Sequence, residues 1–160
     1  MATRALKAYP RAFQVEREVG FDEDMSRARP GDVSLDLGYG RTMLDIIVIN
    51  PFTVARIRAS RNAGSPAVAA EEAYDKKVRK YSDLIDSLTD IPPPRFVPLA
   101  VTATGMWYER SSRWLRKFSS TCAAASGADT GAVFSELMIR LAVALWRGNS
   151  AMIRFCNSEL

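Results

Sequence analysis

The predicted fold is built around the stretch RTMLDIIVIN, residues 41–50. It is short, almost wholly apolar and rich in β-branched residues, which is typical of a buried central strand. Asp45 lies in its middle, where an unpaired carboxylate would be costly to bury. Asp45 therefore has either a basic partner or a bound cation, and both interpretations stay open from the residues alone. The candidate basic partners are Arg41, Arg56 and Arg58.

Three other segments predict further strands. Residues 13–21 alternate apolar and polar side chains, and residues 32–37 form a second short run that ends at a glycine-rich turn. Together with residues 41–50 they predict a meander of three strands. Residues 96–102 follow three consecutive prolines and are apolar enough to form a fourth, buried strand.

Two helices are predicted after the third strand. A long helix is expected to reach about Leu88, because Ser65 is a good N-cap and Pro66 suits the first helical position. Residues 107–118 have helical spacing, with aromatic side chains on one side and basic side chains on another. The tryptophans are expected in the core: Trp107, Trp114 and Trp146.

A last helix is predicted from about residue 130 to residue 147, with Gly148 as its C-terminal cap. It is more apolar than a surface helix requires. Residues 52–64 are polar and basic without a clear period, and they are expected to be a flexible segment. Residues 123–127 are small and are expected to be a linker.

The composition is that of an ordinary soluble globular protein. The chain has 160 residues, of which 48% are hydrophobic and 25% charged, and its net charge of +4 is a mild indication of a polyanionic partner. The absence of histidine excludes serine–histidine triads, HExxH zinc sites and nucleases with a histidine base. Two cysteines without metal-ligand spacing fit an intracellular compartment, and no segment predicts a membrane span.

Two carboxylates are expected at one end of the sheet. Asp32 begins one predicted strand, and Asp45 lies within its hairpin neighbour. Two aspartates, with water and phosphate oxygens, are ligands that suit Mg²⁺. The simpler interpretation of Asp32 is a strand-start aspartate that caps backbone amides. Glu16 or Glu18 can add a further ligand, although a solvated face is the simpler interpretation of both.

One lysine is aimed at these carboxylates. Tyr74 and Tyr81 belong to the apolar stripe of the predicted long helix, and Lys77 falls between them on the same face. Lys80 lies at the flank of this stripe. An ammonium group beside the carboxylates would orient an attacking water or neutralise charge on a phosphate. Alternatively, Lys77 covers apolar surface with its alkyl chain and turns its charge to solvent.

These motifs, in this order, resemble a known nuclease family. They are Arg29-Pro30-Gly31-Asp32, Leu44-Asp45-Ile46-Ile47-Val48, Lys77-Val78-Arg79-Lys80-Tyr81, and residues 96–102 followed by Gly105-Met106-Trp107. The pattern resembles the restriction-like endonuclease domain of site-specific non-LTR retrotransposons, a member of the PD-(D/E)XK superfamily. In two departures, Gly31 stands between the expected proline and aspartate, and Ile47 takes the place of the usual strand lysine.

The resemblance implies an α/β fold with a restriction-endonuclease-like core, a mixed central sheet of about four strands flanked by helices, and a C-terminal helical extension. Residues 1–126 would form the nuclease-like domain, and residues 127–160 would pack on it as the extension. It also implies Mg²⁺-dependent cleavage of DNA, with Mn²⁺ as a substitute, and a nuclear location. The nick would prime reverse transcription by a reverse transcriptase region of a larger polyprotein.

The resemblance also assigns residues. Asp32 and Asp45 match the metal-binding acids, Lys77 matches the catalytic lysine that has moved from the strand to the helix, and Lys80 is a second candidate active-site lysine. DNA phosphate contacts are expected from Arg29, Arg56, Arg58, Arg61, Arg113, Arg116 and Lys117. Each of these, taken singly, is equally consistent with a solvated surface.

Two other functions stay open from the sequence. One is a DNA-binding remnant that keeps the fold without catalysis. The other is a protein-interaction or assembly module, whose apolar last helix docks a partner and whose carboxylates form structural ion pairs. Metal dependence distinguishes the nuclease from both, and salt-dependent DNA affinity distinguishes the remnant from the module.

Overall fold

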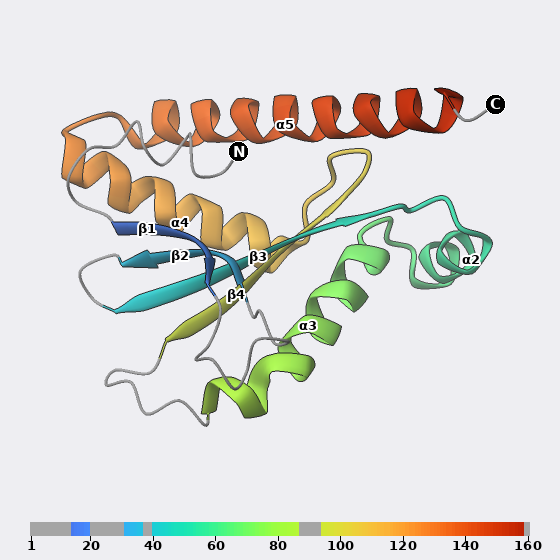
Figure 1. Ribbon diagram of the computed structural model, residues 1–160, viewed down its shortest axis with the longest axis horizontal. Coiled ribbons are helices and arrows are strands. Elements are labelled where there is room, and N and C mark those ends of the chain that lie inside the picture. Colours follow the sequence, from blue (N-terminus) through green and yellow to red (C-terminus); the bar gives the residue numbers. More distant parts are fainter. Residues whose placement is uncertain (1–13, 20–30, 37–39, 87–93, 159–160) are drawn as a thin grey trace.

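The computed structural model describes residues 14–19, 31–36, 40–86 and 94–158. Side chains are described for residues 31–36, 40–83, 85–86 and 94–152. This part of the chain is an α/β structure with a mixed β-sheet flanked by helices, which confirms the predicted fold class at that level (Figure 1). Among these residues, no helix combines the length and hydrophobicity that a membrane span needs. Arg29, Glu16 and Glu18 lie outside the described side chains.

The sheet has the strand order β1-β2-β3-β4. Its strands are β1 (Gln14–Val19), β2 (Gly31–Asp36), β3 (Arg41–Ile49) and β4 (Arg95–Thr102). The first three pair antiparallel, as the predicted meander requires, whereas β4 runs parallel to β3. A parallel neighbour needs a long crossover connection, and helices supply it here. The helices of the described chain are α2 (Val54–Ala63), α3 (Val68–Asp86), α4 (Glu109–Ser126) and α5 (Thr130–Ser158).

The side chains of β3 alternate between two helical layers, because successive residues of a strand point to opposite faces. Leu44 and Ile46 pack with residues of α4 and α5, which lie on one side of the sheet in Figure 1. Asp45 and Ile47 lie on the other face, which α3 covers. This alternation places the aspartate of the central apolar run under α3.

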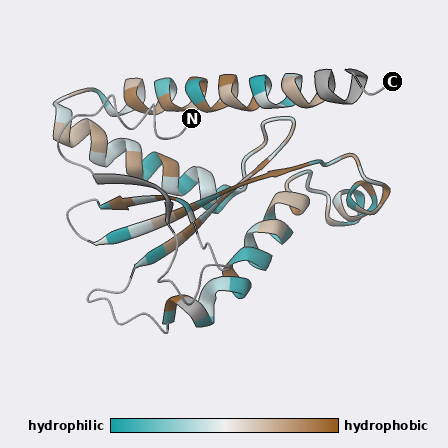
Figure 2. Cartoon of the chain, viewed as in Figure 1, coloured by the Kyte–Doolittle hydropathy of each residue, from teal (hydrophilic) through white to brown (hydrophobic). Residues whose placement is uncertain are grey.

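The larger core lies between the sheet and the α4–α5 layer. Its buried side chains come from three strands and two helices: Val33, Leu35, Leu44, Val97, Leu99, Trp114, Leu115, Phe118, Cys122, Ala123 and Val133. Figure 2 shows hydrophobic residues along β3 and β4. Trp114 lies in this core as predicted, and Trp107 packs at its edge. The prediction is wrong for Trp146, which is 73% exposed on α5.

The opposite face of the sheet is covered by α3, which approaches closely through small side chains. Ala70 of α3 and Ala100 of β4 are fully buried in the same cluster. Further along the helix, the ring of Tyr81 packs edge-on against Phe96 of β4, with 5.2 Å between centroids. The helix is thus seated on the sheet at two points, which sets the direction of the side chains between them, including Lys77.

The expectation of a flexible segment at residues 52–64 is wrong, because Val54–Ala63 form α2. The side chain of Thr53 accepts a hydrogen bond from the amide of Arg56, and Gly64 ends the helix in the left-handed conformation with φ 62°. Within α2, which the structure describes in full, no residue is buried. The sequence of α2 therefore shows no apolar helical period, and the capping residues are what specify this helix.

Two predicted helix ends are also wrong. α4 continues through most of the predicted linker at residues 123–127 and ends at Ser126, with Gly127 as its left-handed cap. α5 does not end at Gly148 but continues to Ser158. Alanine is the best helix former, and a glycine inside a helix costs only about 1 kcal/mol. Neither the run of small residues in α4 nor the single glycine in α5 ends a helix when the residues on both sides favour it.

The outer edge of β4 is closed by a buried serine of α4. The hydroxyl of Ser111 donates to the carbonyl of Pro98 at 3.2 Å and accepts from the amide of Ala100 at 3.0 Å. Because β4 is an edge strand, its outward amides and carbonyls have no ladder partner, and Ser111 supplies one for each of these two groups. Ser111 therefore fixes the beginning of α4 to the strand beside Asp45.

We predict that Ser111→Ala lowers the free energy of unfolding by about 1–3 kcal/mol, because the amide of Ala100 loses its partner in a buried place. Urea denaturation followed by circular dichroism measures the loss. Ser112→Ala is the matched control, because the Ser112 hydroxyl donates to the Glu109 carbonyl at the surface. It should change stability by less than about 0.5 kcal/mol. Equal losses in the two variants would contradict the bracing role of Ser111.

Candidate functional site

Asp45 is the buried charge of β3, with only 5% of its surface exposed. Its neighbours along the strand are Leu44 and Ile46. Across the parallel pair, its register partner on β4 is Pro98. Because strand side chains point out of the plane of the sheet, the partner of this carboxylate is expected in the layer above it.

That partner is Lys77 of α3. Its Nζ lies 3.1 Å from Oδ1 of Asp45 and 2.9 Å from Oδ2. The contact with Oδ1 has the geometry of a hydrogen bond, whereas Oδ2 is buried and has no hydrogen-bond partner among the described residues. The helical spacing that aimed Lys77 at the sheet is confirmed. The partner is a lysine rather than one of the arginines that were candidates, Arg41, Arg56 and Arg58.

Asp32 lies beside Asp45 on the neighbouring strand. Val33 pairs with Leu44 in the antiparallel register, so the next position sets Asp32 opposite Asp45. Directly opposed residues have Cβ atoms about 5 Å apart. Oδ2 of Asp32 accepts a hydrogen bond from the amide of Ile46 at 2.8 Å, which is the capping role of the simpler interpretation. Its other oxygen makes no hydrogen bond with the described residues, so capping and metal binding are compatible.

The environment acts on Asp45 in opposing ways. Burial raises the pKa of Asp45 above 3.8, the hydrogen bond and charge of Lys77 lower it, and the charge of Asp32 raises it again. The result is a raised pKa, because the desolvation of a buried carboxylate is the largest of these effects. The ionised form of Asp45 is therefore less stable in the folded protein than in water.

Lys77 responds differently to the same contact. Burial alone would lower its pKa, but the hydrogen bond and charge of Asp45 outweigh burial and raise it above 10.5. The two upward shifts are compatible because the side chain of Asp45 is 7% exposed and that of Lys77 is 32% exposed. Desolvation thus dominates at the carboxylate, and attraction dominates at the ammonium group. Lys77 carries its positive charge at neutral pH.

An aromatic ring holds a second lysine nearby. Nζ of Lys80 lies over the ring of Tyr81 at 4.8 Å from its centroid, and Nζ of Lys77 lies 5.6 Å from the same centroid. The charge of Lys80 lowers the pKa of Asp45, so this exposed lysine reaches the carboxylate through its field. The sequence analysis did not give Tyr81 this role, although its place in the Lys-Val-Arg-Lys-Tyr motif was the available signal.

The two aspartates offer a partial set of metal ligands. Oδ2 of Asp45 is buried and accepts no hydrogen bond from the described residues, although it lies 2.9 Å from Nζ of Lys77, and a ligand could complete its shell. Among the described residues, no group of three or more His, Cys, Asp or Glu side chains could hold a metal ion. Mg²⁺ commonly takes one or two carboxylates and completes its shell with water and phosphate oxygens. The donor set therefore fits Mg²⁺ shared with a phosphate, and it does not fit a closed zinc or calcium site.

The predicted phosphate-binding residues form two separate clusters. The α2 cluster consists of Arg56, Arg58 and Arg61, on the helix that directly follows β3. The α4 cluster consists of Arg113, Arg116 and Lys117, and α4 packs on the face of the sheet opposite to Asp45 (Figure 1). Arg113 also forms an ion pair with Glu109 on its own helix. The structure thus does not bring the α4 cluster together with the carboxylates.

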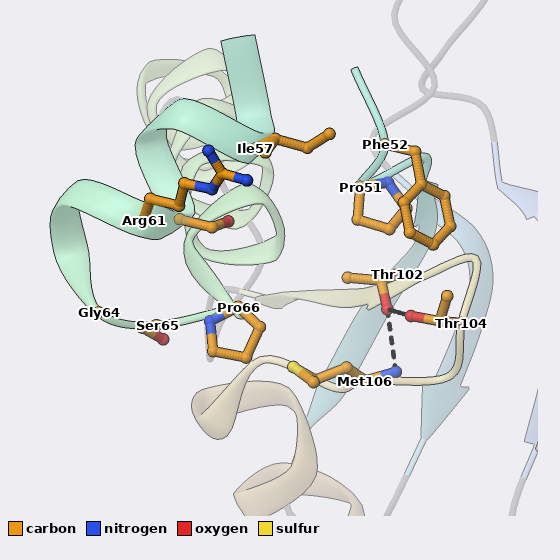
Figure 3. Close-up of a pocket in the computed structure, with 11 residues that line it drawn as sticks. Pro51, Phe52, Ile57, Arg61, Gly64, Ser65, Pro66, Thr102, Thr104 and Met106 are labelled. Atoms are coloured by element: carbon orange, nitrogen blue, oxygen red, sulfur yellow. Dashed lines mark hydrogen bonds between the residues drawn. The ribbon is translucent and has the colours of Figure 1, made fainter. Parts of the chain in front are cut away.

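A groove that the sequence analysis missed lies at the C-terminal ends of β3 and β4. It has a volume of about 430 Å³ and lies between α2, the loop after β3 and the turn after β4 (Figure 3). Phe52, Arg61 and Met106 are among its lining residues. Turns distant in sequence form it, so no local pattern indicated it. The available signal was a Pro-Phe pair in front of a basic segment.

Comparisons of the chain with protein-family models, curated proteins and solved structures gave no match. The resemblance to the retrotransposon endonuclease domain therefore rests on the sequence motifs and stays a prediction. The geometry around Asp45 carries the functional argument.

We predict that Asp45→Asn leaves the free energy of unfolding at pH 7 unchanged or raises it by up to about 1 kcal/mol, because burial disfavours the charge that this change removes. Below pH 3.8 both proteins carry a neutral side chain there. As the pH rises through the raised pKa of Asp45, the unfolded chain ionises first, so the wild type loses stability relative to the variant.

Urea denaturation between about pH 4 and pH 8 measures this difference. Asp83→Asn, at an exposed position of α3, controls for the loss of one negative charge. A large loss of stability in Asp45→Asn at pH 7 would show that the ion pair with Lys77 outweighs burial, which would contradict this account.

Proposed function

We propose that this protein is a Mg²⁺-dependent endonuclease that hydrolyses phosphodiester bonds of DNA. The observation that carries the proposal is the buried Asp45, with Asp32 in register opposite it and Nζ of Lys77 at 2.9 Å. Two carboxylates and a lysine on one face of a mixed sheet are the constellation of a PD-(D/E)XK nuclease. A restriction-endonuclease-like core is therefore part of the proposal, and the order of the sequence motifs supports it.

Asp45 and Asp32 are the residues that would hold the metal ion. Oδ1 of Asp32 makes no hydrogen bond with the described residues, and Oδ2 of Asp45 has only its ion-pair contact with Lys77 at 2.9 Å, so a bound metal ion would share that oxygen with the ammonium group. When bound, Mg²⁺ supplies charge neutralisation at the phosphate and lowers the pKa of a coordinated water. Mn²⁺ accepts the same oxygen ligands and would substitute for it.

Lys77 acts as a positioned cation. Its raised pKa keeps the ammonium group protonated at neutral pH, so Lys77 donates hydrogen bonds and does not take a proton from water. The contact with Asp45 fixes Nζ beside the carboxylates, where a scissile phosphate would have to lie. Its charge would orient the attacking water or stabilise the negative charge that builds up on the phosphate. Lys80, at the edge of the same site, adds a second positive charge.

The family resemblance adds a context to this activity. The nick in target DNA would prime reverse transcription by a reverse transcriptase region of a larger polyprotein, in the nucleus. These parts of the proposal depend on the sequence motifs alone.

Specific observations favour the two alternatives. Lys77 already satisfies Oδ1 of Asp45 and the Ile46 amide already binds Asp32, so a DNA-binding remnant without catalysis would keep the same contacts. The assembly module is favoured by α5, which exposes large apolar side chains: Ile139, Val143 and Trp146. Metal-dependent cleavage distinguishes the nuclease from both.

Plasmid nicking with and without Mg²⁺ or Mn²⁺ tests the nuclease. We predict metal-dependent nicking that Asp45→Ala abolishes and that Lys77→Met slows by about 100-fold or more, because removal of one group that stabilises transition-state charge commonly costs that much. Lys76→Met is the matched control, because Lys76 precedes Lys77 on α3 and is exposed. It should keep the rate of the wild type.

Equal losses in the Lys76 and Lys77 variants would contradict the assigned role of Lys77. DNA binding without nicking under either metal would identify the inactive remnant, whose affinity should fall with salt. A protein that neither nicks nor binds DNA would favour the assembly module.

Thermal unfolding tests metal binding separately from catalysis. We predict that MgCl₂ raises the melting temperature, since a ligand that binds only the folded state stabilises it by about 2.7 kcal/mol at a hundredfold excess over its dissociation constant. Asp45→Asn should abolish this rise, and Asp83→Asn, at an exposed position of α3, should retain it. The same rise in both variants would mean a general salt effect and no site at Asp45.

A further inference from the structure

The groove at the ends of β3 and β4 is held in shape by hydrogen bonds. In its floor, Oγ1 of Thr102 accepts from the amide of Met106 at 3.0 Å and lies 2.8 Å from Oγ1 of Thr104 (Figure 3). In the wall before α2, the amide of Phe52 donates to the side-chain oxygen of Asn50 at 2.9 Å. The groove is therefore formed before any ligand arrives.

An aromatic side chain of this wall is turned to solvent. Phe52 borders the groove and is 68% exposed. A single exposed apolar side chain is common on protein surfaces, so the exposure of Phe52 matters only because its ring borders a groove that also has apolar walls. Val54 is 67% exposed but does not line the groove. The position of Phe52, more than its exposure, sets it apart.

The charge around the groove is positive. Arg61 lines it, and α2 also carries Arg56 and Arg58 but no aspartate or glutamate. Figure 3 shows the side chains of Ile57 and Arg61 extending from α2 toward the groove. An apolar groove flanked by arginine matches a ligand that combines a flat apolar part with negative charge. A nucleotide within a DNA strand has both.

We propose that this groove binds an unpaired nucleobase of a DNA strand, which stacks on Phe52 while Arg61 contacts the adjoining phosphate. Single-stranded nucleic acids are generally held in this way, by aromatic stacking and a positively charged path for the backbone. The volume of about 430 Å³ lies within the range of small-ligand sites. An acidic or apolar protein segment is the competing occupant, but it would not use the flat face of Phe52 together with the charge of Arg61.

This inference rests on the proposed function and narrows its substrate. α3 begins beside the groove, and Val68 and Lys77 are separated by about 13 Å along the helix at about 1.5 Å per residue. This distance corresponds to about four steps of a DNA strand. A strand whose unpaired base occupies the groove would place a phosphate a few nucleotides away beside Lys77. The favoured substrate is therefore DNA with a gap, flap or bubble next to the nick, rather than continuous duplex.

Fluorescence anisotropy of a labelled oligothymidine, measured in EDTA, reports single-strand binding without cleavage. Phe52→Ala should lower the affinity about 5- to 150-fold, which is the loss expected when one stacking side chain is removed. Val54→Ala should keep the affinity of the wild type. Arg61→Gln should weaken binding more than Arg58→Gln, which removes one charge from the same helix at a position that does not line the groove.

Stacking itself has a separate readout. An oligonucleotide that contains 2-aminopurine should lose fluorescence when the wild type binds it, because stacking on an aromatic ring quenches the base. Phe52→Ala should remove this quenching, and Val54→Ala should retain it.

A wild type that does not bind the oligonucleotide, or equal affinities of the Phe52 and Val54 variants, would overturn the proposal. Binding that depends on Phe52 supports the proposed nucleobase site even if plasmid nicking is never seen. In that case the proposed nuclease activity is wrong, and the nucleobase site is retained. Equal rates of nicking on gapped and continuous duplex, together with binding that does not depend on Phe52, would overturn the proposed nucleobase site. The proposed nuclease activity would be retained.

Discussion

The structure depends on the placement of one carboxylate inside an apolar strand. Asp45 interrupts a buried run of β3, and its side chain points out of the sheet toward α3. Lys77 of α3 contacts it at 2.9 Å. Burial raises the pKa of Asp45 against the opposing effect of Lys77, and the same contact raises the pKa of Lys77.

The sheet separates the larger core from the proposed site. The α4–α5 layer covers one face with large branched and aromatic side chains, among them Leu115 and Phe118, which form the larger core. The α3 layer covers the other face with small residues such as Ala70 and with titratable ones such as Lys77. Because adjacent residues of β3 alternate between these layers, Leu44 stabilises the fold from one side while Asp45 serves the site on the other.

In the proposed function, the α2 region extends the site beyond the carboxylates. The second half of β3 and a short loop connect Asp45 to Phe52, which borders the groove. Arg61 and its neighbours on α2 contribute charge without any role in the core. A helix that buries no residue yet keeps both caps is consistent with selection for what its surface binds.

Much of the fold follows from local patterns. Alternation and apolar runs located β3 and β4 closely. Helical spacing selected Lys77 over Lys76 as the lysine that faces the sheet. Both predictions succeeded because the periods of strands and helices are properties of the backbone itself. The same reasoning failed for α2 and for the passage of α5 through Gly148. Where no core face imposes a period, caps and neighbouring residues decide the helix.

Local sequence patterns predicted the strands and the long helix, and they indicated Asp32, Asp45 and Lys77 as candidates for a metal-assisted site. The tertiary structure pairs Asp45 with Lys77 rather than with an arginine, since that pairing depends on how α3 crosses the sheet. It also decided that the α4 cluster lies across the sheet from Asp45 and that Phe52 borders a groove. Such relations join residues distant in the chain, and packing, not local periodicity, sets them.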